Sequence, residues 1–272
     1  MHRRIALRLF AAVALFFVTA SLAPRPAPPR LVHQSKSLNR VSRHFAAGLE
    51  YLLVEPREVA PDAELPMVVW LHGRGGAPAA PAHRFLDLEQ PVRLILPRGP
   101  LPAGEGYAWM PVSAHHGESE ALNAPLRQRM HELSEAMTEW RRRHPTRGLP
   151  IVAGFSQGGI LTATLAVTHP ESIYRAFPLA GWIPDSLAPV AYDPYAAHVP
   201  MHALHGADDA IIGAARTRAQ LTRMRRMGYP VVYEELANTE HEITPEMLDR
   251  LRALIARALR VQPEATGEAG NS

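Results

Sequence analysis

Glycines surround one serine of the chain. The stretch Val152–Ile160 reads VAGFSQGGI, with Ser156 at its centre, and it stands where an apolar run ends and a helical pattern begins. Glycine tolerates positive φ and close backbone approach, so an ordinary tight turn would account for this composition. The same G-x-S-x-G spacing also forms a strained strand-to-helix turn that raises a serine hydroxyl above a sheet as a nucleophile. Three fixed positions do not decide between these two interpretations.

A serine nucleophile needs a base and an acid, and candidates for both lie downstream. A base must remove the hydroxyl proton, and His241, in the loop ANTEHEIT, is the candidate. The imidazolium so formed needs a carboxylate that fixes its tautomer and offsets its charge, which Asp209 or Asp208 of the sequence HGADD could supply. Serine, aspartate and histidine occur in the chain order that is typical of one class of hydrolases.

The oxyanion of an acyl-transfer reaction also needs two backbone N–H donors that already point at it. One would be the N–H of Gln157, directly after the serine. The other is expected in the glycine-rich loop HGRGG, His72–Gly76, with Arg74 as the candidate. This loop lacks the spacing of a G-x-G-x-x-G or Walker loop, so phosphate or dinucleotide binding is disfavoured.

Strands and helices must bring these residues together. Apolar runs of strand length alternate with helical patterns, which predicts an α/β fold with a mostly parallel, doubly covered sheet in a single domain. The predicted strands are Gly48–Val54, Met67–Leu71, Val92–Leu96, Ile151–Gly154, Ala176–Ala180, Met201–Leu204 and Val231–Glu235. The predicted helices are Ala121–Arg143, Gln157–His169, Ile211–Met227 and Pro245–Leu259. The HGRGG loop and each triad candidate follow a predicted strand, at the edge where such sheets bind ligands.

Composition agrees with one large domain and excludes some chemistry. The chain has 272 residues, of which 47% are apolar and 20% charged, enough for one sizeable core. The absence of cysteine excludes disulfides and thiolate catalysis. The formal net charge is +3, and the arginines are spread over helical patterns such as Ala215–Arg226. That spread is typical of a solvated helix face, so no nucleic-acid partner is expected.

Residues 1–23 have the pattern of an export signal or of an N-terminal anchor. A positive start at His2–Arg4 precedes the uncharged, mostly apolar run Leu9–Ala23, which is short for a membrane span. We therefore expect an exported protein, periplasmic or secreted, or else one attached to the membrane through residues 5–23. The remaining predicted parts are a Pro-rich linker over 24–40, the α/β domain over 41–260 and a disordered tail over 261–272.

Other histidines are weaker candidates for chemistry. The stretch SAHHGESE, residues 113–120, holds two histidines and two glutamates. Adjacent histidines cannot easily face one ion and no third ligand is spaced to join them, so a solvated loop is favoured and no metal is expected. His72 and His205 each precede a glycine at a predicted strand end, and we expect them to hydrogen-bond the loops that they start.

Together these stretches resemble the phospholipase/carboxylesterase family of α/β-hydrolases, which includes acyl-protein thioesterases and bacterial carboxylesterases. The resemblance runs from about Gly48 to Leu259, and its most specific motifs are LHGRGG, LPRGP, YAWMPV, GFSQGG, PLAGWIP, HGADD and EHEITPE. It implies an α/β-hydrolase fold, the catalytic triad Ser156, Asp209 and His241, no metal and no organic cofactor.

The resemblance also implies a shallow apolar groove for an acyl chain. One wall is expected in the loop Gly104–Gly117, with Trp109 and Met110 as candidates, although Trp109 could equally pack in the core. The chain departs from the family pattern at Gly76, where an aspartate is common, and at Glu240, where a glycine usually precedes the histidine. Neither departure removes a catalytic group.

The sequence thus predicts a cofactor-independent serine hydrolase that cleaves carboxylic ester or thioester bonds of small molecules or lipids through an acyl-serine intermediate. Two alternatives stay open, a non-catalytic envelope binding protein on a hydrolase scaffold and a serine peptidase. The intact set of catalytic residues disfavours the first.

Overall fold

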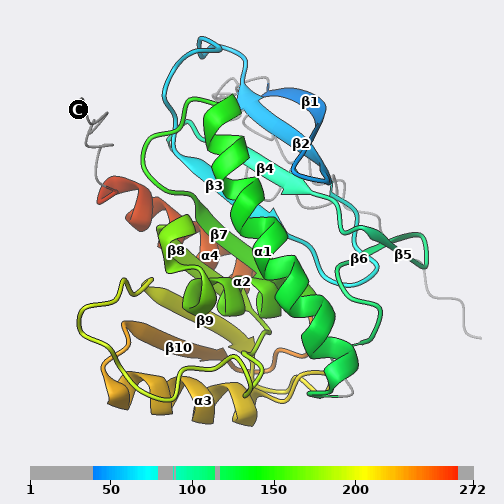
Figure 1. The fold of residues 1–272 in the computed structure, drawn as a ribbon, viewed down its shortest axis with the longest axis vertical. Helices are drawn as coiled ribbons and strands as arrows, with labels where there is room; N and C mark the ends of the chain where they lie inside the picture. The colour runs from blue at the N-terminus through cyan, green and yellow to red at the C-terminus, as the bar shows by residue number, and fades with distance from the viewer. Residues whose placement is uncertain (1–38, 79–87, 89, 114–116, 263–272) are drawn as a thin grey trace, which may run out of the picture. The chain divides into compact units, whose positions relative to one another are not determined.

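The computed structural model describes residues 39–78, 88, 90–113 and 117–262 (Figure 1). The chain divides into two units, Met1–Lys36 and Ser37–Ser272, and every described residue belongs to the second. The predicted export signal or anchor, residues 1–23, therefore lies outside the described residues. Among the described helices, none is long and apolar enough to cross a membrane.

Strands and helices alternate along the second unit. Its strands are β1 (Asn39–Ala46), β2 (Leu49–Pro56), β3 (Met67–Leu71), β4 (Arg93–Pro97), β5 (Leu101–Ala103), β6 (Gly106–Ala108), β7 (Ile151–Phe155), β8 (Arg175–Leu179), β9 (Met201–Gly206) and β10 (Val231–Leu236). Its helices are α1 (Glu120–Arg143), α2 (Gln157–Thr168), α3 (Ala214–Met227) and α4 (Pro245–Arg260), with a short 3-10 helix, η3 (Pro170–Ser172). Each predicted strand and helix is present, with ends shifted by a few residues.

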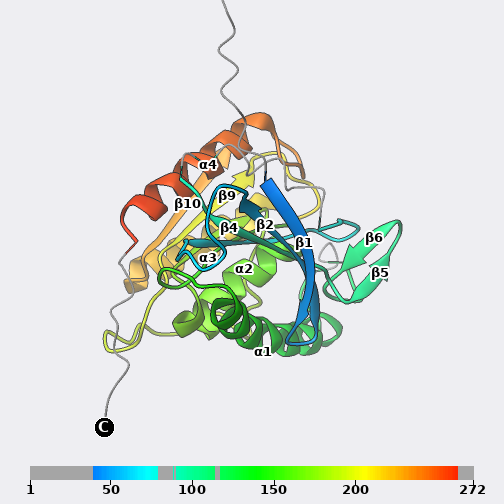
Figure 2. The same cartoon turned by 90° about the horizontal axis from the view of Figure 1, so that it is seen from above.

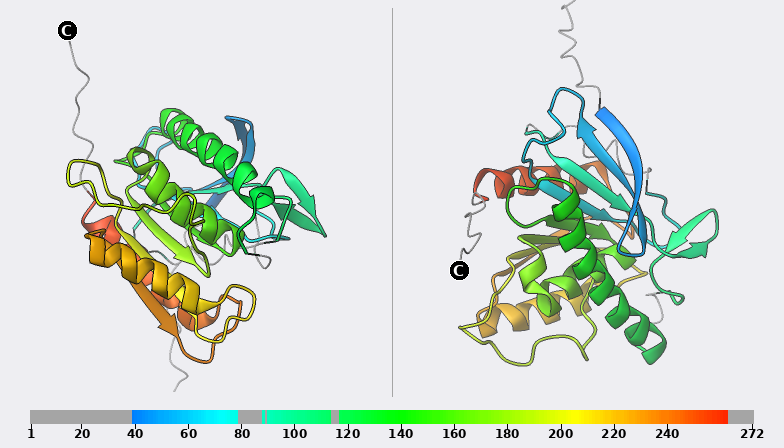
Figure 3. Two further views of the ribbon diagram at one scale, coloured as in Figure 1. Left: turned by 60° about the horizontal axis from the view of Figure 1, so that its bottom comes forward. Right: turned by 45° about the horizontal axis from the view of Figure 1, so that its top comes forward.

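Eight strands form one sheet in the order β1-β2-β4-β3-β7-β8-β9-β10 (Figure 1). From β4 to β10 neighbouring strands of the sheet are parallel, whereas β2 pairs antiparallel with both β1 and β4. The strands β5 and β6 form a separate hairpin that projects away from the sheet (Figure 3). The prediction of a mostly parallel sheet is confirmed.

Helices cover both faces of this sheet (Figure 2). On one face α1, α2 and α3 contribute side chains such as Trp140, Leu161 and Met224 to one core cluster. On the other face α4 contributes Leu251 and Ile255 to a second cluster. Because β3 lies between the two clusters, all five of its residues are buried, which explains its unbroken apolar run.

The structure adds to the prediction at both ends of the domain. The strand β1, whose residues are mostly half-buried or exposed, was not predicted, and it takes up the last two residues of the predicted linker 24–40. At the other end Gln262 falls within the predicted tail 261–272, yet it is buried. Its amide donates hydrogen bonds to the carbonyls of Arg147 and Leu149, so the domain extends to this residue.

The register of the parallel strands brings their carboxyl ends to one edge. The last paired residues are Leu71 with Gly154, Phe155 with Leu179, Leu179 with Leu204 and Gly206 with Leu236. The loops that follow β3, β7, β9 and β10 therefore start along the same edge of the sheet. These are the four loops in which the sequence places catalytic candidates.

Candidate active site

Ser156 stands in a strained turn between β7 and α2. Its φ and ψ are 57° and −116°, a conformation that residues other than glycine rarely adopt and that costs on the order of 1–3 kcal/mol. Its N–H donates to the carbonyl of Leu179 at 3.0 Å, and its own carbonyl accepts from the N–H of Ile160 at 2.9 Å. These bonds hold the turn, so the serine has the geometry of a nucleophile elbow rather than of an ordinary surface turn.

The glycines next to this serine allow backbone to touch backbone. A Cβ on Gly158 would lie 1.9 Å from the carbonyl oxygen of Leu71, the last residue of β3. A Cβ on Gly154 would lie 2.4 Å from the carbonyl oxygen of Gly158 itself. The first turn of α2 therefore sits directly on the ends of β3 and β7, and no other residue type fits at these two positions.

The three predicted triad residues meet at this edge. Oγ of Ser156 lies 2.9 Å from Nε2 of His241, and Nδ1 of His241 lies 2.8 Å from Oδ2 of Asp209. The imidazole also packs against the ring of Phe155, with 4.9 Å between ring centroids. The structure thus brings together residues from the loops after β7, β9 and β10. More than fifty residues of chain lie between the serine and the aspartate.

Geometry distinguishes the two aspartates that the sequence left open. Asp209 is buried, and its Oδ1 accepts hydrogen bonds from the N–H groups of Ile211 and Ile212 at 2.9 and 2.8 Å. Its second oxygen is thereby turned toward His241. Asp208 is exposed. The same two hydrogen bonds shape the turn before α3, which is why this helix begins at Ala214 and not at the predicted Ile211.

The HGRGG loop lies beside the serine. A Cβ on Gly73 would come 3.3 Å from the Cβ of Ser156. The N–H of Gly75 donates to Tyr107 at 2.8 Å, and that of Gly76 donates to Gly73 at 3.0 Å, so both are used within the loop region. The N–H of Gln157 opens α2, and the first N–H groups of a helix have no acceptor within it. The pairing of Gln157 with Arg74 as oxyanion donors stays a prediction.

His72 has the structural role that was predicted for it. One ring nitrogen, Nδ1, donates to the carbonyl of Gly73 at 2.7 Å, and the other, Nε2, accepts from the N–H of Gly99 at 3.0 Å. Burial lowers the pKa of His72, which keeps the ring neutral and suits one donor and one acceptor. The ring therefore fixes the start of the HGRGG loop against the loop after β4.

Trp109 and Met110 do not line an open groove. Both side chains belong to the core cluster under α1 and α2, with exposed fractions of 1% and 0%. The indole N–H of Trp109 donates to the carbonyl of His72 at 2.9 Å. The core-packing alternative thus describes Trp109, and the same holds for Met110, because neither side chain has surface left to offer to an acyl chain.

Glu118, from the stretch considered for metal binding, serves as a hydrogen-bond acceptor. It accepts from the N–H groups of Asp185 and Ser186, from the side chain of Asn123 and from Arg216. Although partial burial opposes ionisation, the hydrogen bonds from Asp185, Asn123 and Ser186 lower the pKa of Glu118 to about 2. The two histidines of this stretch lie outside the described residues, and the part that is described contains no group of three ligands that could hold a metal ion.

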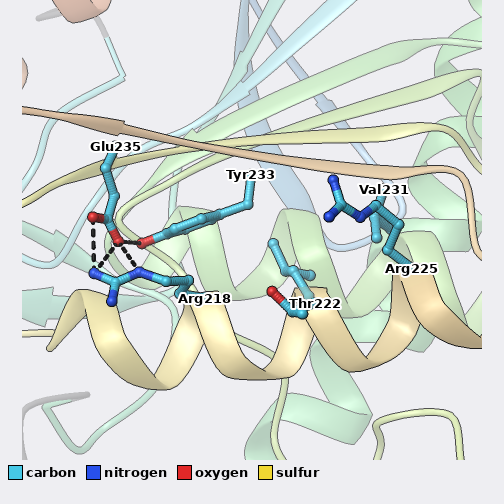
Figure 4. A pocket seen from close by; sticks show the side chains of 7 residues that line it. Arg218, Thr222, Arg225, Val231, Tyr233 and Glu235 are labelled. Atoms are coloured by element: carbon cyan, nitrogen blue, oxygen red, sulfur yellow. Dashed lines mark hydrogen bonds and ion pairs between the residues drawn. The ribbon is translucent and has the colours of Figure 1, made fainter.

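A cavity of about 320 Å³ lies between α3 and β10, and it includes no triad residue (Figure 4). Three of its polar side chains form one network: Arg218 donates two hydrogen bonds to Glu235, at 2.7 and 2.8 Å, and the hydroxyl of Tyr233 donates to the same carboxylate at 2.8 Å. The one carboxylate of this lining is thus held by three donors, and no serine or histidine belongs to the lining, so the cavity is not a rival to the triad as a catalytic site.

Two features of the site were not predicted from the sequence. The side chain of Gln157, of which only the backbone N–H was considered, is buried and hydrogen-bonded to the backbone of Trp109 at 3.0 Å. The N–H groups that hold Asp209 were also missed. A glutamine at the first position of an otherwise apolar helix is a signal for the first feature, because a buried amide requires partners.

Comparison with known proteins agrees with this geometry. The chain matches the model of the family described as Phospholipase/Carboxylesterase over residues 56–259. It is 29% identical to the acyl-protein thioesterase 1 homolog 2 of Dictyostelium discoideum over 131 residues, 44% of this chain and 57% of that protein. It is 23% identical to a probable carboxylesterase of Oryza sativa subsp. japonica over 240 residues, 80% of this chain and 87% of that protein. The chain thus spans little more than half of the first relative and most of the second.

Solved structures share the fold at low identity. The esterase PE8 has a TM-score of 0.62 and 20% identity, covering 73% of this chain and 95% of that chain. A carboxylesterase from Mesorhizobium loti has a TM-score of 0.62 and 18% identity, covering 79% of this chain and 98% of that chain. These likenesses confirm the α/β-hydrolase fold. Since the family model covers most of the sequence, this chain belongs to the phospholipase/carboxylesterase family of α/β-hydrolases.

Proposed function

We propose that this protein is a serine hydrolase that cleaves carboxylic ester or thioester bonds through an acyl-serine intermediate. The observation that carries the proposal is the continuous contact from Ser156 through His241 to Asp209, at 2.9 and 2.8 Å. Membership of the family and similarity to a thioesterase homologue and a probable carboxylesterase support the ester or thioester as substrate. The substrates would be small-molecule or lipid acyl esters.

In the acylation step Ser156 attacks the acyl carbon while Nε2 of His241 takes the hydroxyl proton. The carboxylate of Asp209 accepts from Nδ1–H, so the free lone pair is on Nε2, where the proton must go. The same carboxylate offsets the charge of the imidazolium. The N–H groups of Gln157 and Arg74 would hold the oxyanion, each with an effect of about 10²–10³ on the rate.

Acylation is completed when the leaving alcohol or thiol takes the proton from His241 and departs. The acyl group is then bound to Ser156 as an ester. A water molecule gives its proton to Nε2 of His241 and attacks that ester, and the proton returns to the serine oxygen as the free acid leaves. Every proton moves through one imidazole, and the step requires neither a metal nor an organic cofactor.

The first test is the hydrolysis of p-nitrophenyl esters from acetate to palmitate and of a palmitoyl thioester. We expect Ser156→Ala to lower kcat by about 10⁴-fold or more, while Ser134→Ala, on the half-buried flank of α1, leaves it unchanged. Two aspartates supply a second matched pair. We expect Asp209→Asn to lower kcat by about 10⁴-fold, and Asp208→Asn, at an exposed position, to leave kcat unchanged. A parent without activity on any ester or thioester would favour the binding-protein alternative, and preferential cleavage of peptide anilides would favour a peptidase.

We also propose that the protein is exported, or attached to the membrane through residues 5–23. The support is the positive, apolar and small-residue pattern of residues 1–23, followed by proline-rich residues. Cell fractionation of the full chain, with N-terminal sequencing of the product, separates the two outcomes. A start within residues 21–31 in the soluble fraction indicates cleavage, whereas an intact chain in the membrane fraction indicates an anchor. An intact chain in the cytosol would contradict both.

A further inference from the structure

The side chain of Gln157 makes three hydrogen bonds to one short stretch of backbone. Its Oε1 accepts from the N–H of Trp109 at 3.0 Å. Its Nε2 donates to the carbonyls of Met110 and Val112, at 3.2 and 2.9 Å. With 1% of the residue exposed, both ends of the amide are satisfied by protein alone. We call the stretch 107–112, sequence YAWMPV, the bridging segment.

The bridging segment is also bound to the HGRGG loop. The guanidinium of Arg74 donates to the carbonyls of Met110 and Pro111, each at 3.3 Å. Tyr107 and the loop glycines exchange backbone hydrogen bonds at 2.8 and 2.9 Å. The indole of Trp109 adds a bond to the carbonyl of His72. One segment is therefore tied to the loop after β3 and to the first residue of α2.

These contacts join the two residues whose N–H groups would form the oxyanion hole. Gln157 follows β7 and Arg74 follows β3, so more than eighty residues of chain separate them and no short covalent link sets the spacing of their N–H groups. Each residue instead sends its side chain to the bridging segment, and both side chains bind the same carbonyl, that of Met110.

We propose that Gln157 and Arg74 are positioning residues through their side chains, and that the bridging segment fixes the distance between their backbone N–H groups. This inference rests on the proposed hydrolase function and adds to it the element that aligns the oxyanion hole. An oxyanion hole acts by being aligned before the reaction, and a misplacement of about 1 Å can cost on the order of 10² in rate. The side chains thus act on the transition state without touching the substrate.

The test uses Gln157→Met, which keeps the length and volume of the side chain but removes all its hydrogen bonds. We expect kcat to fall by about 10–100-fold, with KM within about threefold, because the donors act on the oxyanion more than on the bound ester. An alkyl trifluoromethyl ketone, which forms an oxyanion on the serine, should lose affinity in proportion to kcat/KM. End-point titration with an alkyl fluorophosphonate counts competent Ser156, so kcat is expressed per titrated site.

A merely structural role gives a different result. In that case Gln157→Met lowers the number of titrated sites and the melting temperature but leaves kcat per site and inhibitor affinity at the parent's values, which would overturn the proposal. Arg74→Met supplies a second variant because Arg74 is exposed and its loss does not threaten the core. We expect its kcat per site to fall by about threefold to tenfold, and no fall would also overturn the proposal.

The double variant tests the shared segment. If both side chains act through the bridging segment, the combined loss is smaller than the product of the two single losses, since the first substitution already frees the segment. Independent, multiplicative losses would contradict a common support. Failure of the proposed function itself looks different, because the parent would then show neither ester hydrolysis nor fluorophosphonate labelling of Ser156.

Discussion

His205 and Asp209 are both buried, and Nε2 of His205 lies 3.3 Å from Oδ2 of Asp209. The same nitrogen lies 2.8 Å from the carbonyl oxygen of Ile212, and since a carbonyl can only accept, this nitrogen carries the hydrogen. Burial lowers the pKa of His205, which favours the neutral ring. The histidine therefore closes the turn that presents Asp209 without adding a second charge beside the triad.

This contact predicts a loss of activity when the ring loses its donor. His205→Phe keeps a buried ring but leaves the carbonyl of Ile212 without its partner, which should lower the free energy of unfolding by about 1–3 kcal/mol. The turn that holds Asp209 should loosen, and we expect kcat to fall about tenfold. Urea unfolding and initial rates measure both effects.

The control lies on the same strand. His202→Phe removes a half-buried histidine that bonds Glu234 at 2.9 Å, away from the triad. Its kcat should equal that of the parent. If His205→Phe also keeps the parent's kcat, the turn does not depend on this ring.

The glycine next to the elbow predicts a loss of stability. A Cβ on Gly158 would lie 1.9 Å from backbone oxygen that cannot move aside, so Gly158→Ala should cost about 3 kcal/mol or more. Gly213 is the matched control, because its φ is −58° and a Cβ there would meet nothing within 4 Å. Gly213→Ala should change the free energy of unfolding by no more than about 0.5 kcal/mol. Equal losses for the two variants would show that α2 can move off β3.

The turn at Ser156 holds the catalytic serine in a strained backbone conformation, so we expect a residue without this strain to make the protein more stable but inactive. Its φ of 57° is strained for serine and ordinary for glycine. Ser156→Gly should therefore raise the free energy of unfolding by about 1 kcal/mol relative to Ser156→Ala, which keeps a Cβ in the strained turn. Both variants should be inactive. Thermal and urea unfolding of the two proteins decide the point, and a less stable glycine variant would mean that the turn is not strained.

The triad could be predicted because each of its residues carries a local signal. Ser156 has its glycines, and His241 and Asp209 follow apolar runs that end at one edge of a parallel sheet. The chain order of serine, acid and base then leaves few other residues that could form the triad. The meeting of these residues at one edge follows already from the alternation of strands and helices, because parallel strands end at the same edge of a sheet. The exact register of the strands is not needed to predict it.

Side-chain direction could not be predicted in the same way. In the stretch YAWMPV the aromatic Trp109 is followed by the apolar Met110, and such a pair suits a groove wall as well as a core. In the fold Trp109 and Met110 join the core cluster to which α1 and α2 contribute, and this long-range packing buries them. The role of the Gln157 amide depends on the same long-range contact. The strand β1 was missed because an edge strand with arginine, serine and histidine has no continuous apolar run.

Glu118 couples three segments through one carboxylate. It joins the start of α1 to the N–H groups of Asp185 and Ser186 and to Arg216 of α3, and its pKa is lowered to about 2. In the unfolded chain a glutamate has a pKa of about 4.3. Because the folded pKa is the lower one, the unfolded state takes up the proton first as the pH falls. The stabilisation is therefore complete above about pH 5 and is lost progressively as the pH falls toward 2.

This difference between the folded and unfolded pKa predicts that Glu118→Gln lowers the free energy of unfolding by an amount that depends on pH. At pH 7 the variant should be less stable than the parent by on the order of 1 kcal/mol, since water screens part of the effect at a carboxylate that is partly exposed. At pH 3 the parent's own carboxylate is losing its advantage, so the difference should shrink. Glu120→Gln, which breaks an exposed ion pair with Arg127, serves as the control and should cost little at either pH. Urea titrations at pH 7 and pH 3 measure the stability of each variant relative to the parent. If Glu118→Gln lowers the free energy of unfolding equally at both pH values, the charge of Glu118 does not contribute to stability.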